Sequence, residues 1–390
     1  MYSKSRLSSL LEFIPWETFT ELTEQFKTDR YTKKFDTRSH LISHIAGQLM
    51  GCRSLRELQT AYNSQSHEHY HLRSSDIKRS TLAEANQKRD AGVFESLCKV
   101  MLGTVHRKLR KQIKEQLYLL DSTSITLSGL GYDDWTLSNK TQRTQGIKCH
   151  ILYAREAQAP VYAHVTAANV NDIEDAKRLI IENGATYVFD KGYYDYNWWW
   201  KITQSGAYFV SRFKYNAGLI DHQPYENGHK NSPNILCDET VRLKYKHLGH
   251  SRRLNQYQNP LRKVTVRREG KSPLVLVTND FSKSADQIAE LYKTRWEIEL
   301  FFKWLKQNLK IKKFWGQSEN AVRIQLFTAL ITYLLVHMFH QSQKMTMSLK
   351  LFVALLSTSL FQRPETEYAL AKRKRKKREQ YSLLQGSLFT

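Results

Sequence analysis

The spacing of hydrophobic and polar residues changes partway along the chain. Over residues 1–112 apolar positions recur every three or four residues, as at Leu41, Ile45 and Leu49, and this period predicts helices. Over residues 113–214 short apolar runs of strand length alternate with helix-like segments. The pattern therefore predicts an all-helical N-terminal domain followed by an α/β domain.

Three features of the N-terminal segment allow further predictions. Ser54 follows Gly51 and can cap a second short helix, but the resulting likeness to a helix-turn-helix is weak, because many helical bundles contain it. Residues 81–84 form a capping-box pattern that predicts the start of one long helix through Leu102. The histidine-rich stretch 67–71 has no companion Cys or His at ligand spacing. We therefore expect a solvated loop there and not a metal site.

The apolar runs of the α/β segment follow the order strand, strand, strand, helix, strand, helix, strand. The expected strands are 117–120 with 125–127, then 147–153, 161–166, 186–189 and 207–213, and the expected helices are 172–181 and 196–204. This order is that of a ribonuclease-H-like fold, in which crossover helices cover a mixed sheet.

The rest of the chain divides into three segments. Residues 215–280 contain an Asn227-Gly228 turn signal and alternating runs rich in Lys, Arg and His, which predict a β-rich insertion subdomain. Residues 281–345 read as helices that complete the core. Residues 346–390 end in the seven cations of 372–378, which cannot pack and predict a solvated basic arm.

Charge and cysteine content narrow the class of protein. The chain has 60 Lys and Arg against 37 Asp and Glu, a formal net charge of +23, which favours nucleic acid as a partner over an anionic membrane surface. Its four cysteines form no CxxC pair, a usage that fits a reducing cytoplasm. No signal peptide opens the chain. The longest apolar run, 326–339, is too short to span a bilayer and predicts a buried helix.

Three acidic residues are candidates for metal chemistry. Asp121 lies in or just after an apolar strand, Asp190 ends another strand, and Glu299 falls on a predicted helix. A carboxylate at a buried strand is unfavourable unless a cation compensates it. Three such groups suit two Mg²⁺ ions, with Mn²⁺ as a substitute, which would activate an attacking hydroxyl and stabilise a leaving oxygen. Taken singly, each aspartate could instead cap the turn that follows it.

Residues 292–306 carry the most distinctive spacing in the chain. They lack Pro and Gly and read as one helix, on which Tyr292, Arg295, Glu299 and Lys306 gather beside the apolar stripe. An acidic side chain next to two cationic side chains and a phenol is an arrangement that can bind a phosphate together with a metal ion. The spacing is equally typical of an amphipathic helix with an ordinary Arg295–Glu299 pair.

These residues resemble the Y-x2-R-x3-E-x6-K signature of a large group of bacterial insertion-sequence transposases in the DDE superfamily. Asp121-Ser-Thr and Asp190-x-Gly-Tyr also resemble the neighbourhoods of that group's first two acids, and 209–214 resembles the strand that follows the second. The resemblance implies that Asp121, Asp190 and Glu299 are both the catalytic residues and the metal ligands.

The resemblance also implies how DNA is bound. Arg295 and Lys306 would contact phosphates near the cleaved bond, and Tyr292 would position the strand end. Arg212 and Lys214, in the strand after the second acid, would add DNA contacts. The implied substrates are double-stranded DNA at the element's terminal inverted repeats and target DNA, cut and joined by a homodimer in the bacterial cytoplasm without a membrane partner. The helical N-terminal domain would bind the repeats.

Whether a hairpin intermediate forms stays open. Some relatives hold a flipped base with an aromatic residue of the β insertion, but all eight Trp of this chain lie outside that segment. Tyr225, Tyr245 and Tyr257 are the candidates instead.

Two other functions remain to be weighed. One is a ribonuclease-H-like nuclease or resolvase that cuts without joining, and the other is a catalytically inactive DNA-binding protein. The signature and the insertion argue against the first, and three intact acids argue against the second.

Overall fold

The chain is described from a computed structural model. The described residues are 4–112, 115–139, 144–225, 232–244, 253–309, 311 and 313–363. They fall into two compact units. The helical unit comprises Met1–Leu97, Asn308–Gly316 and Asn320–Thr390, and the sheet unit comprises Cys98–Gln307 and Gln317–Glu319. Residues 98–112 therefore group with the sheet and residues 320–345 with the helices, which differs from the expected segment boundaries.

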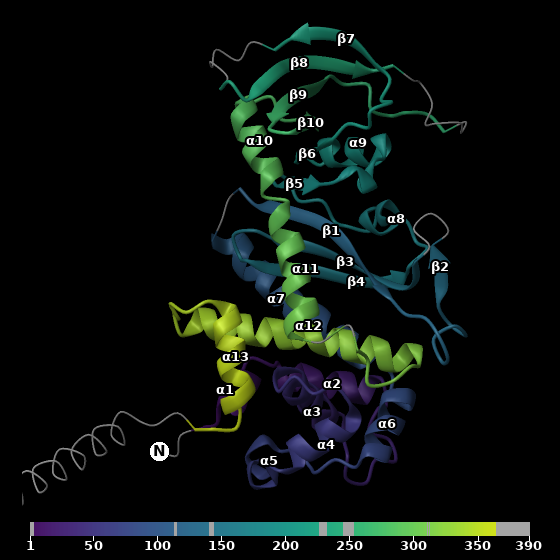
Figure 1. Cartoon of the computed structure of the whole chain (residues 1–390), viewed down its shortest axis with the longest axis vertical. Helices are drawn as coiled ribbons and strands as arrows, with labels where there is room; N and C mark the ends of the chain where they lie inside the picture. Colours follow the sequence, from purple (N-terminus) through teal and green to yellow (C-terminus); the bar gives the residue numbers. More distant parts are fainter. Residues whose placement is uncertain are drawn as a thin grey trace, which may run out of the picture. The chain divides into compact units, whose positions relative to one another are not determined.

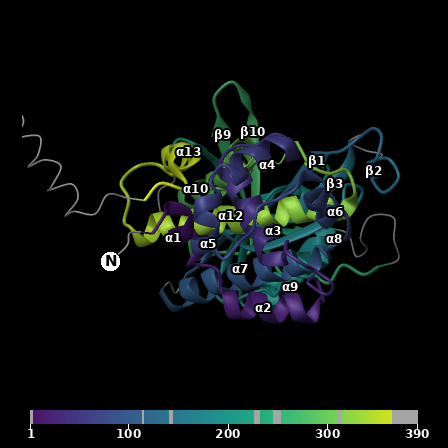
Figure 2. The same cartoon turned by 90° about the horizontal axis from the view of Figure 1, so that it is seen from below.

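The helical unit is built around the buried helix α12 (Glu319–Ser342). Its elements are α1 (Arg6–Leu11), α2 (Trp16–Gln25), α3 (Thr37–Leu49), α4 (Leu55–Asn63), α5 (Ser66–Leu72), α6 (Arg79–Lys88), the start of α7 (Gly92–Gln112), α12 (Glu319–Ser342) and α13 (Leu349–Ser359). Gln48 on α3 donates to Gln325 O and to Thr328 Oγ1, and it accepts from Thr332, so α3 packs along α12 (Figure 2).

The length of α12 exceeds the sequence-based expectation. It has 24 residues and is long and apolar enough to cross a membrane, although 83% of its most apolar window is buried inside the protein. Burial of that kind is what the core helix of a folded domain shows, as the sequence predicted for the run 326–339.

Two predictions for the helical unit are wrong. The long helix expected from 81–84 is instead α6 and α7, separated at Arg89, because Asn320 donates to the Asn86 and Arg89 carbonyls and accepts from the Ala91 amide. The stretch 67–71, expected as a solvated loop, lies in α5. There His69 is buried and stacks on Tyr62, because that ring offers a partner which the local sequence does not reveal. The cap at Ser54 is confirmed, since its side chain accepts from the Glu57 amide.

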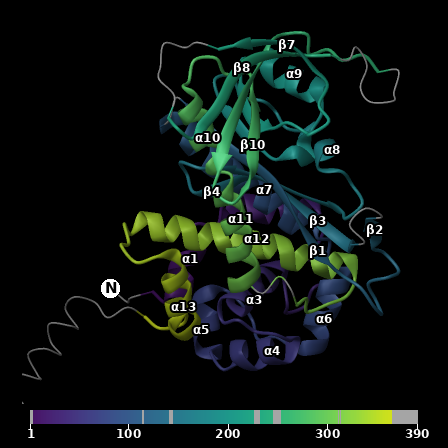
Figure 3. The ribbon, with the colours of Figure 1, turned by 45° about the horizontal axis from the view of Figure 1, so that its top comes forward.

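The sheet unit contains one ten-stranded mixed sheet (Figures 1 and 3). Its strands are β1 (Leu117–Thr126), β2 (Leu137–Asn139), β3 (Thr144–Ala154), β4 (Ala159–Ala167), β5 (Thr186–Phe189), β6 (Tyr208–Arg212), β7 (Leu219–Pro224), β8 (Ile235–Leu243), β9 (Leu261–Arg268) and β10 (Lys271–Thr278). They follow the order β2-β3-β1-β5-β6-β10-β9-β8-β7, with β4 paired to β3. Strands β1, β5 and β6 are parallel, and the other pairs are antiparallel.

The short helices of the sheet unit are α8 (Asp172–Ala176), the 3-10 turn η1 (Lys191–Tyr193) and α9 (Tyr196–Gln204). Helix α8 is shorter than predicted, because Lys201 on α9 donates to the carbonyls of Lys177 and Leu179, where a longer helix would continue. Trp198 and Trp199 on α9 are buried, as expected of core residues.

The signature segment is two helices and not one. Helix α10 (Ala285–Lys293) ends at a turn that contains Arg295, and α11 (Trp296–Asn308) follows it. Figure 1 shows the two helices running one after the other along the sheet. The turn forms because the Thr294 hydroxyl and amide both donate to Leu291 O, which closes α10 locally. Glu299 and Lys306 therefore both lie on α11, whereas Tyr292 lies on α10.

The segment 215–280 contains strands β7 to β10, of which β7 was not predicted, and these strands extend the same sheet. The Asn227-Gly228 turn, Tyr245 and the basic arm 372–378 lie outside the described residues.

Candidate active site

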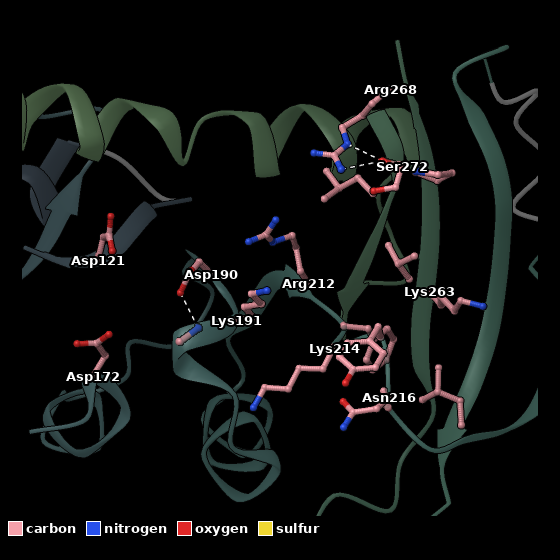
Figure 4. Close-up of a pocket in the computed structure, with 18 of the residues that line it drawn as sticks. Asp121, Asp172, Asp190, Lys191, Arg212, Lys214, Asn216, Lys263, Arg268 and Ser272 are labelled. Atoms are coloured by element: carbon pink, nitrogen blue, oxygen red, sulfur yellow. Dashed lines mark hydrogen bonds between the residues drawn. The ribbon is translucent and has the colours of Figure 1, made fainter. Parts of the chain in front are cut away.

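The two strand aspartates lie beside each other because their strands are neighbours. Strand β1 is fully buried from Leu117 to Leu120, and Asp121, the next residue, is half-buried. Strand β5 is fully buried throughout, and Asp190 follows its last residue. Because β1 and β5 are parallel with Leu120 opposite Phe189, the next residue of each strand is one of these aspartates. Both line one cleft (Figure 4).

Each aspartate has one oxygen held by the local backbone. Asp121 Oδ1 accepts from the Ser122 amide at 2.8 Å, and Asp190 Oδ1 accepts from the Gly192 amide at 2.6 Å. The turn-capping role that the sequence allowed for Asp190 is therefore present. The bond occupies Oδ1 of the carboxylate, and among the described residues no side chain or amide donates to Oδ2.

Arg295 connects the helix-borne acid to the first aspartate. One guanidinium nitrogen lies 2.6 Å from Glu299 Oε1, and another lies 3.9 Å from Asp121 Oδ2. A single guanidinium group, with one contact on each side, therefore spans the distance between the carboxylates of Asp121 and Glu299. All three acids singled out from the sequence meet in one region of the sheet unit.

Burial perturbs the carboxyl group of Asp121 more than the charges around it do. Burial, and the negative charges of Asp190 and Glu299, raise the pKa of Asp121 to about 7, although the Ser122 amide and Arg295 oppose this. Among the described residues, however, no three His, Cys, Asp or Glu side chains converge closely enough to hold a metal ion as they stand. Glu299 is paired with Arg295 instead.

The predicted DNA-binding residues take different positions around the acids. The Lys306 ammonium donates to Thr123 Oγ1 at 2.5 Å and to Ser124 O at 3.3 Å, just beyond Asp121 on β1. The ring of Tyr292 lies near two guanidinium groups, 6.0 Å from that of Arg212 and 5.9 Å from that of Arg295.

The cleft has a volume of about 1150 Å³ and extends from the aspartates to the insertion strands. Arg212 and Lys214 line it, as do residues that sequence reasoning missed. The missed charged residues are Lys148 and, labelled in Figure 4, Asp172, Lys191, Lys263 and Arg268. Tyr292, Arg295, Glu299 and Lys306 are not among its lining residues. Asp172 begins α8 after a short loop that follows β4, whereas Asp121 lies within β1 and Asp190 directly follows β5.

Of the aromatic candidates for base stacking, Tyr225 and Tyr257 are not presented to the cleft. The ring of Tyr257 is 1% exposed, and the Tyr225 hydroxyl donates to Phe281 O while Arg262 covers its ring. Tyr215, which sequence reasoning missed, lines the cleft and is fully exposed.

Comparison with known proteins identifies the family. The transposase DDE domain model matches residues 112–335, more than half of the chain, and a domain of unknown function (DUF4372) matches residues 3–72. The chain is 39% identical to y4zB of Sinorhizobium fredii, a protein named as a transposase, over 72% of this chain and 77% of the relative. It is 26% identical to a Geobacillus stearothermophilus protein named as the transposase of insertion sequence element IS5377, over 68% and 69% of the two chains.

Among solved structures, the chain is similar to the piggyBac transposase in a synaptic complex with hairpin DNA. The identity is 13% and the TM-score is 0.48, with 95% of this chain and 84% of that chain covered. A TM-score below 0.5 is too low for us to infer a shared mechanism. The domain match and the 39% identical relative are sufficient by themselves. The chain belongs to the DDE-domain transposase family.

Proposed function

We propose that this transposase cuts at its element ends and transfers the freed 3′-hydroxyls to target DNA, using Asp121, Asp190 and Glu299 as its catalytic acids. As a DDE transposase the chain is an enzyme of DNA cleavage and strand transfer. The observation that supports this site best is the shared guanidinium of Arg295, which contacts Asp121 and Glu299 beside Asp190.

The order of the strands supports a ribonuclease-H-like catalytic core. Three antiparallel strands, β4, β3 and β1, are followed across the sheet by β5 and β6, which are parallel to β1. We infer that segments 113–214 and 281–307 form this core. The segment 215–280 enters between β6 and α10 as an insertion that extends the same sheet.

The acids fit divalent metal ions by their chemistry. All three offer carboxylate oxygens, the donors that Mg²⁺ and Mn²⁺ prefer, and Asp121 is half-buried with a raised pKa that an added cation would lower. We propose that the three residues hold two Mg²⁺ ions, which supply an activated nucleophile and stabilise the leaving oxygen. Glu299 has to exchange Arg295 for metal before it can take part.

The cations around the acids are suited to DNA phosphates. Arg212 and Arg295 each have a buried Nε–H without a hydrogen-bond partner among the described residues, so each has a donor to offer. Lys306 adds a point charge beside β1, and Lys214 extends the positive lining toward the insertion. We propose that Tyr292, near the two guanidinium groups, positions the strand end.

The partners follow from the reaction. We propose that the substrates are terminal inverted repeats and target DNA in the bacterial cytoplasm, and that two copies of the chain hold the two ends together. The helical segment 1–112 is our candidate for the part that binds the repeats. We also propose that cleavage proceeds through a hairpin, with Tyr215 stacking on an unpaired base in place of the buried Tyr257.

A nuclease or resolvase that cuts without joining, and a DNA-binding protein without catalysis, are the alternatives. The test uses short duplexes that cover the DNA flanking the coding sequence, with Mg²⁺, and scores both cleavage and joining to a target plasmid. Joined products support a transposase, whereas cleavage without joining supports the nuclease.

Glu299→Gln tests the site itself. We expect it to abolish cleavage while DNA affinity in a filter-binding assay changes little, because the substitution removes one acid and no phosphate contact. Glu290→Gln removes an equal charge from an exposed pair on α10 and serves as the control. Normal cleavage by Glu299→Gln in Mg²⁺ would refute the assignment.

A further inference from the structure

A fourth carboxylate, Asp172, lines the cleft with Asp121 and Asp190 (Figure 4). It is the first residue of α8 and is 26% exposed. Its Oδ1 accepts from the Ser122 hydroxyl at 2.7 Å and pairs with the Lys148 ammonium at 3.0 Å. Among the described residues its contacts fall on Oδ1, so Oδ2 has no such partner.

Ser122 links Asp172 to the first catalytic acid. The Ser122 amide donates to Asp121, and its hydroxyl donates to Asp172. The rotamer of Ser122 and the position of the β1 backbone at Asp121 are therefore fixed together. Lys148, which is 5% exposed and also donates to Val170 O, holds the other side of the Asp172 carboxylate.

Gly192 links Asp172 to the second catalytic acid. A Cβ atom on Gly192 would lie 2.8 Å from Asp190 Oδ1 and 3.3 Å from Asp172 Oδ2, so both carboxylates pack against this glycine. The Gly192 amide holds Asp190. A side chain at this position would force the two carboxylates apart.

Two buried polar atoms beside this cluster have no hydrogen-bond partner within the described part of the chain. His150 is 0% exposed, and its Nδ1 lies 3.8 Å from Asp172 Oδ1 and 4.0 Å from Asp175 Oδ2. The Tyr193 hydroxyl is also buried and unpaired, and burial followed by the charges of Asp172, Asp121 and Asp190 raises the pKa of Tyr193. Unsatisfied buried donors next to carboxylates are unfavourable unless a further group joins them.

We propose that Asp172 is a positioning carboxylate of the active site, which raises its affinity for divalent cations by fixing Asp121 through Ser122 and Asp190 through Gly192. The inference rests on the proposed function of Asp121 and Asp190. Removing a residue that orients metal ligands typically lowers metal affinity by about 10- to 100-fold. Its free oxygen adds negative charge on the same side of the cleft.

The competing account is that Asp172 only neutralises Lys148. A buried cation without its partner is destabilising, so Asp172→Asn alone could act through Lys148 or could fail to fold. The double variant Asp172→Asn with Lys148→Met removes both charges and leaves no unpaired ion. If Asp172 only balances Lys148, the double variant binds cations as the wild type does.

The experiment measures Mn²⁺ binding to the full chain without DNA, from the free-ion signal in electron paramagnetic resonance. We expect Asp172→Asn and the double variant each to bind Mn²⁺ about tenfold more weakly, and Asp190→Asn to lose tight binding. Glu174→Gln, which removes an equal charge from an exposed pair on the same helix, keeps wild-type affinity. Circular dichroism confirms folding of each variant.

A second measurement separates positioning from a general loss of structure. We expect Asp172→Asn, or the double variant if the single one unfolds, to recover cleavage when Mg²⁺ is raised about tenfold, because its cation requirement and not its maximal rate has changed. If the double variant binds Mn²⁺ with wild-type affinity, the inference about Asp172 is wrong, but the proposed metal site is unaffected. Wild-type affinity in Asp190→Asn overturns the proposed site and this inference with it.

Discussion

Arg295 and a divalent cation compete for the same carboxylates, and this competition predicts an unusual mutant. In the DNA-free protein Arg295 holds Glu299 at 2.6 Å and faces Asp121 at 3.9 Å. Glu299 has to leave Arg295 before it can bind a metal ion. Arg295→Gln removes that competitor. We expect the variant to bind Mn²⁺ more tightly than the wild type when DNA is absent.

The size of the effect follows from the contact that is lost. A hydrogen bond between charged groups contributes about 1.5–3 kcal/mol. The Glu299 side chain is 33% exposed, so solvent reduces this to about 1–2 kcal/mol. Because every ~1.4 kcal/mol is a factor of ten, we expect Mn²⁺ affinity to rise about five- to thirtyfold.

Titration of the DNA-free protein with Mn²⁺, followed by the free-ion signal or by calorimetry, measures this change. Lys293→Gln is the matched control, since it removes one positive charge from an exposed pair on the preceding helix. DNA cleavage by Arg295→Gln should fall, because a phosphate donor is gone, so the two readouts move in opposite directions. Mn²⁺ affinity equal to or weaker than that of the wild type would show that Arg295 does not compete with the cation.

Four further predictions concern other parts of the chain. Lys306→Met should weaken DNA binding and lower the slope of log affinity against log salt by about one in a filter-binding titration, because one phosphate contact is lost. Burial lowers the pKa of His44 to about 3, below that of an unfolded histidine, so acid favours unfolding. We expect thermal or urea unfolding to show about 2 kcal/mol less stability at pH 5 than at pH 7. The loss should be smaller in His44→Gln. Gly146→Ala should lower the free energy of unfolding by at least about 2 kcal/mol, because φ is +137° and a Cβ would meet Ile125 O at 2.2 Å. Gly103→Ala, with open space around it in α7, should instead raise the free energy of unfolding by about 0.5–1 kcal/mol. Tyr215→Ala should reduce hairpin product relative to the first nick on a gel, since stacking on a base contributes about 1–3 kcal/mol; an unchanged ratio would exclude Tyr215 from that step.

The sequence was most informative where burial and chain direction alone decide the structure. The apolar runs before Asp121 and Asp190 end at those residues because a carboxylate leaves the buried part of a sheet. Such positions can be recognised in the sequence, because each depends on only a few neighbouring residues. The same local logic found strand β5 and helix α9 with their observed bounds.

Features that depend on distant partners were missed or misjudged. The break at Arg89 depends on Asn320, far along the chain, and the burial of His69 depends on the ring of Tyr62. The turn at Arg295 was hidden because the helix formers on either side of it make one continuous periodic pattern. Asp172 also follows a strand, but only the pairing of β1 with β3 and the turn at Gly192 show that it reaches the other acids.

The contacts of the site converge on Asp121. One of its oxygens faces Arg295, and the other is held by Ser122, which also reaches Asp172. Burial and the neighbouring acids raise the pKa of Asp121 to about 7, so the site favours a positive charge near this carboxylate. Arg295 supplies that charge in the DNA-free protein. If a DNA phosphate attracts Arg295 as we propose, a divalent cation has to replace it, and we then expect DNA and metal each to strengthen the binding of the other by the same factor.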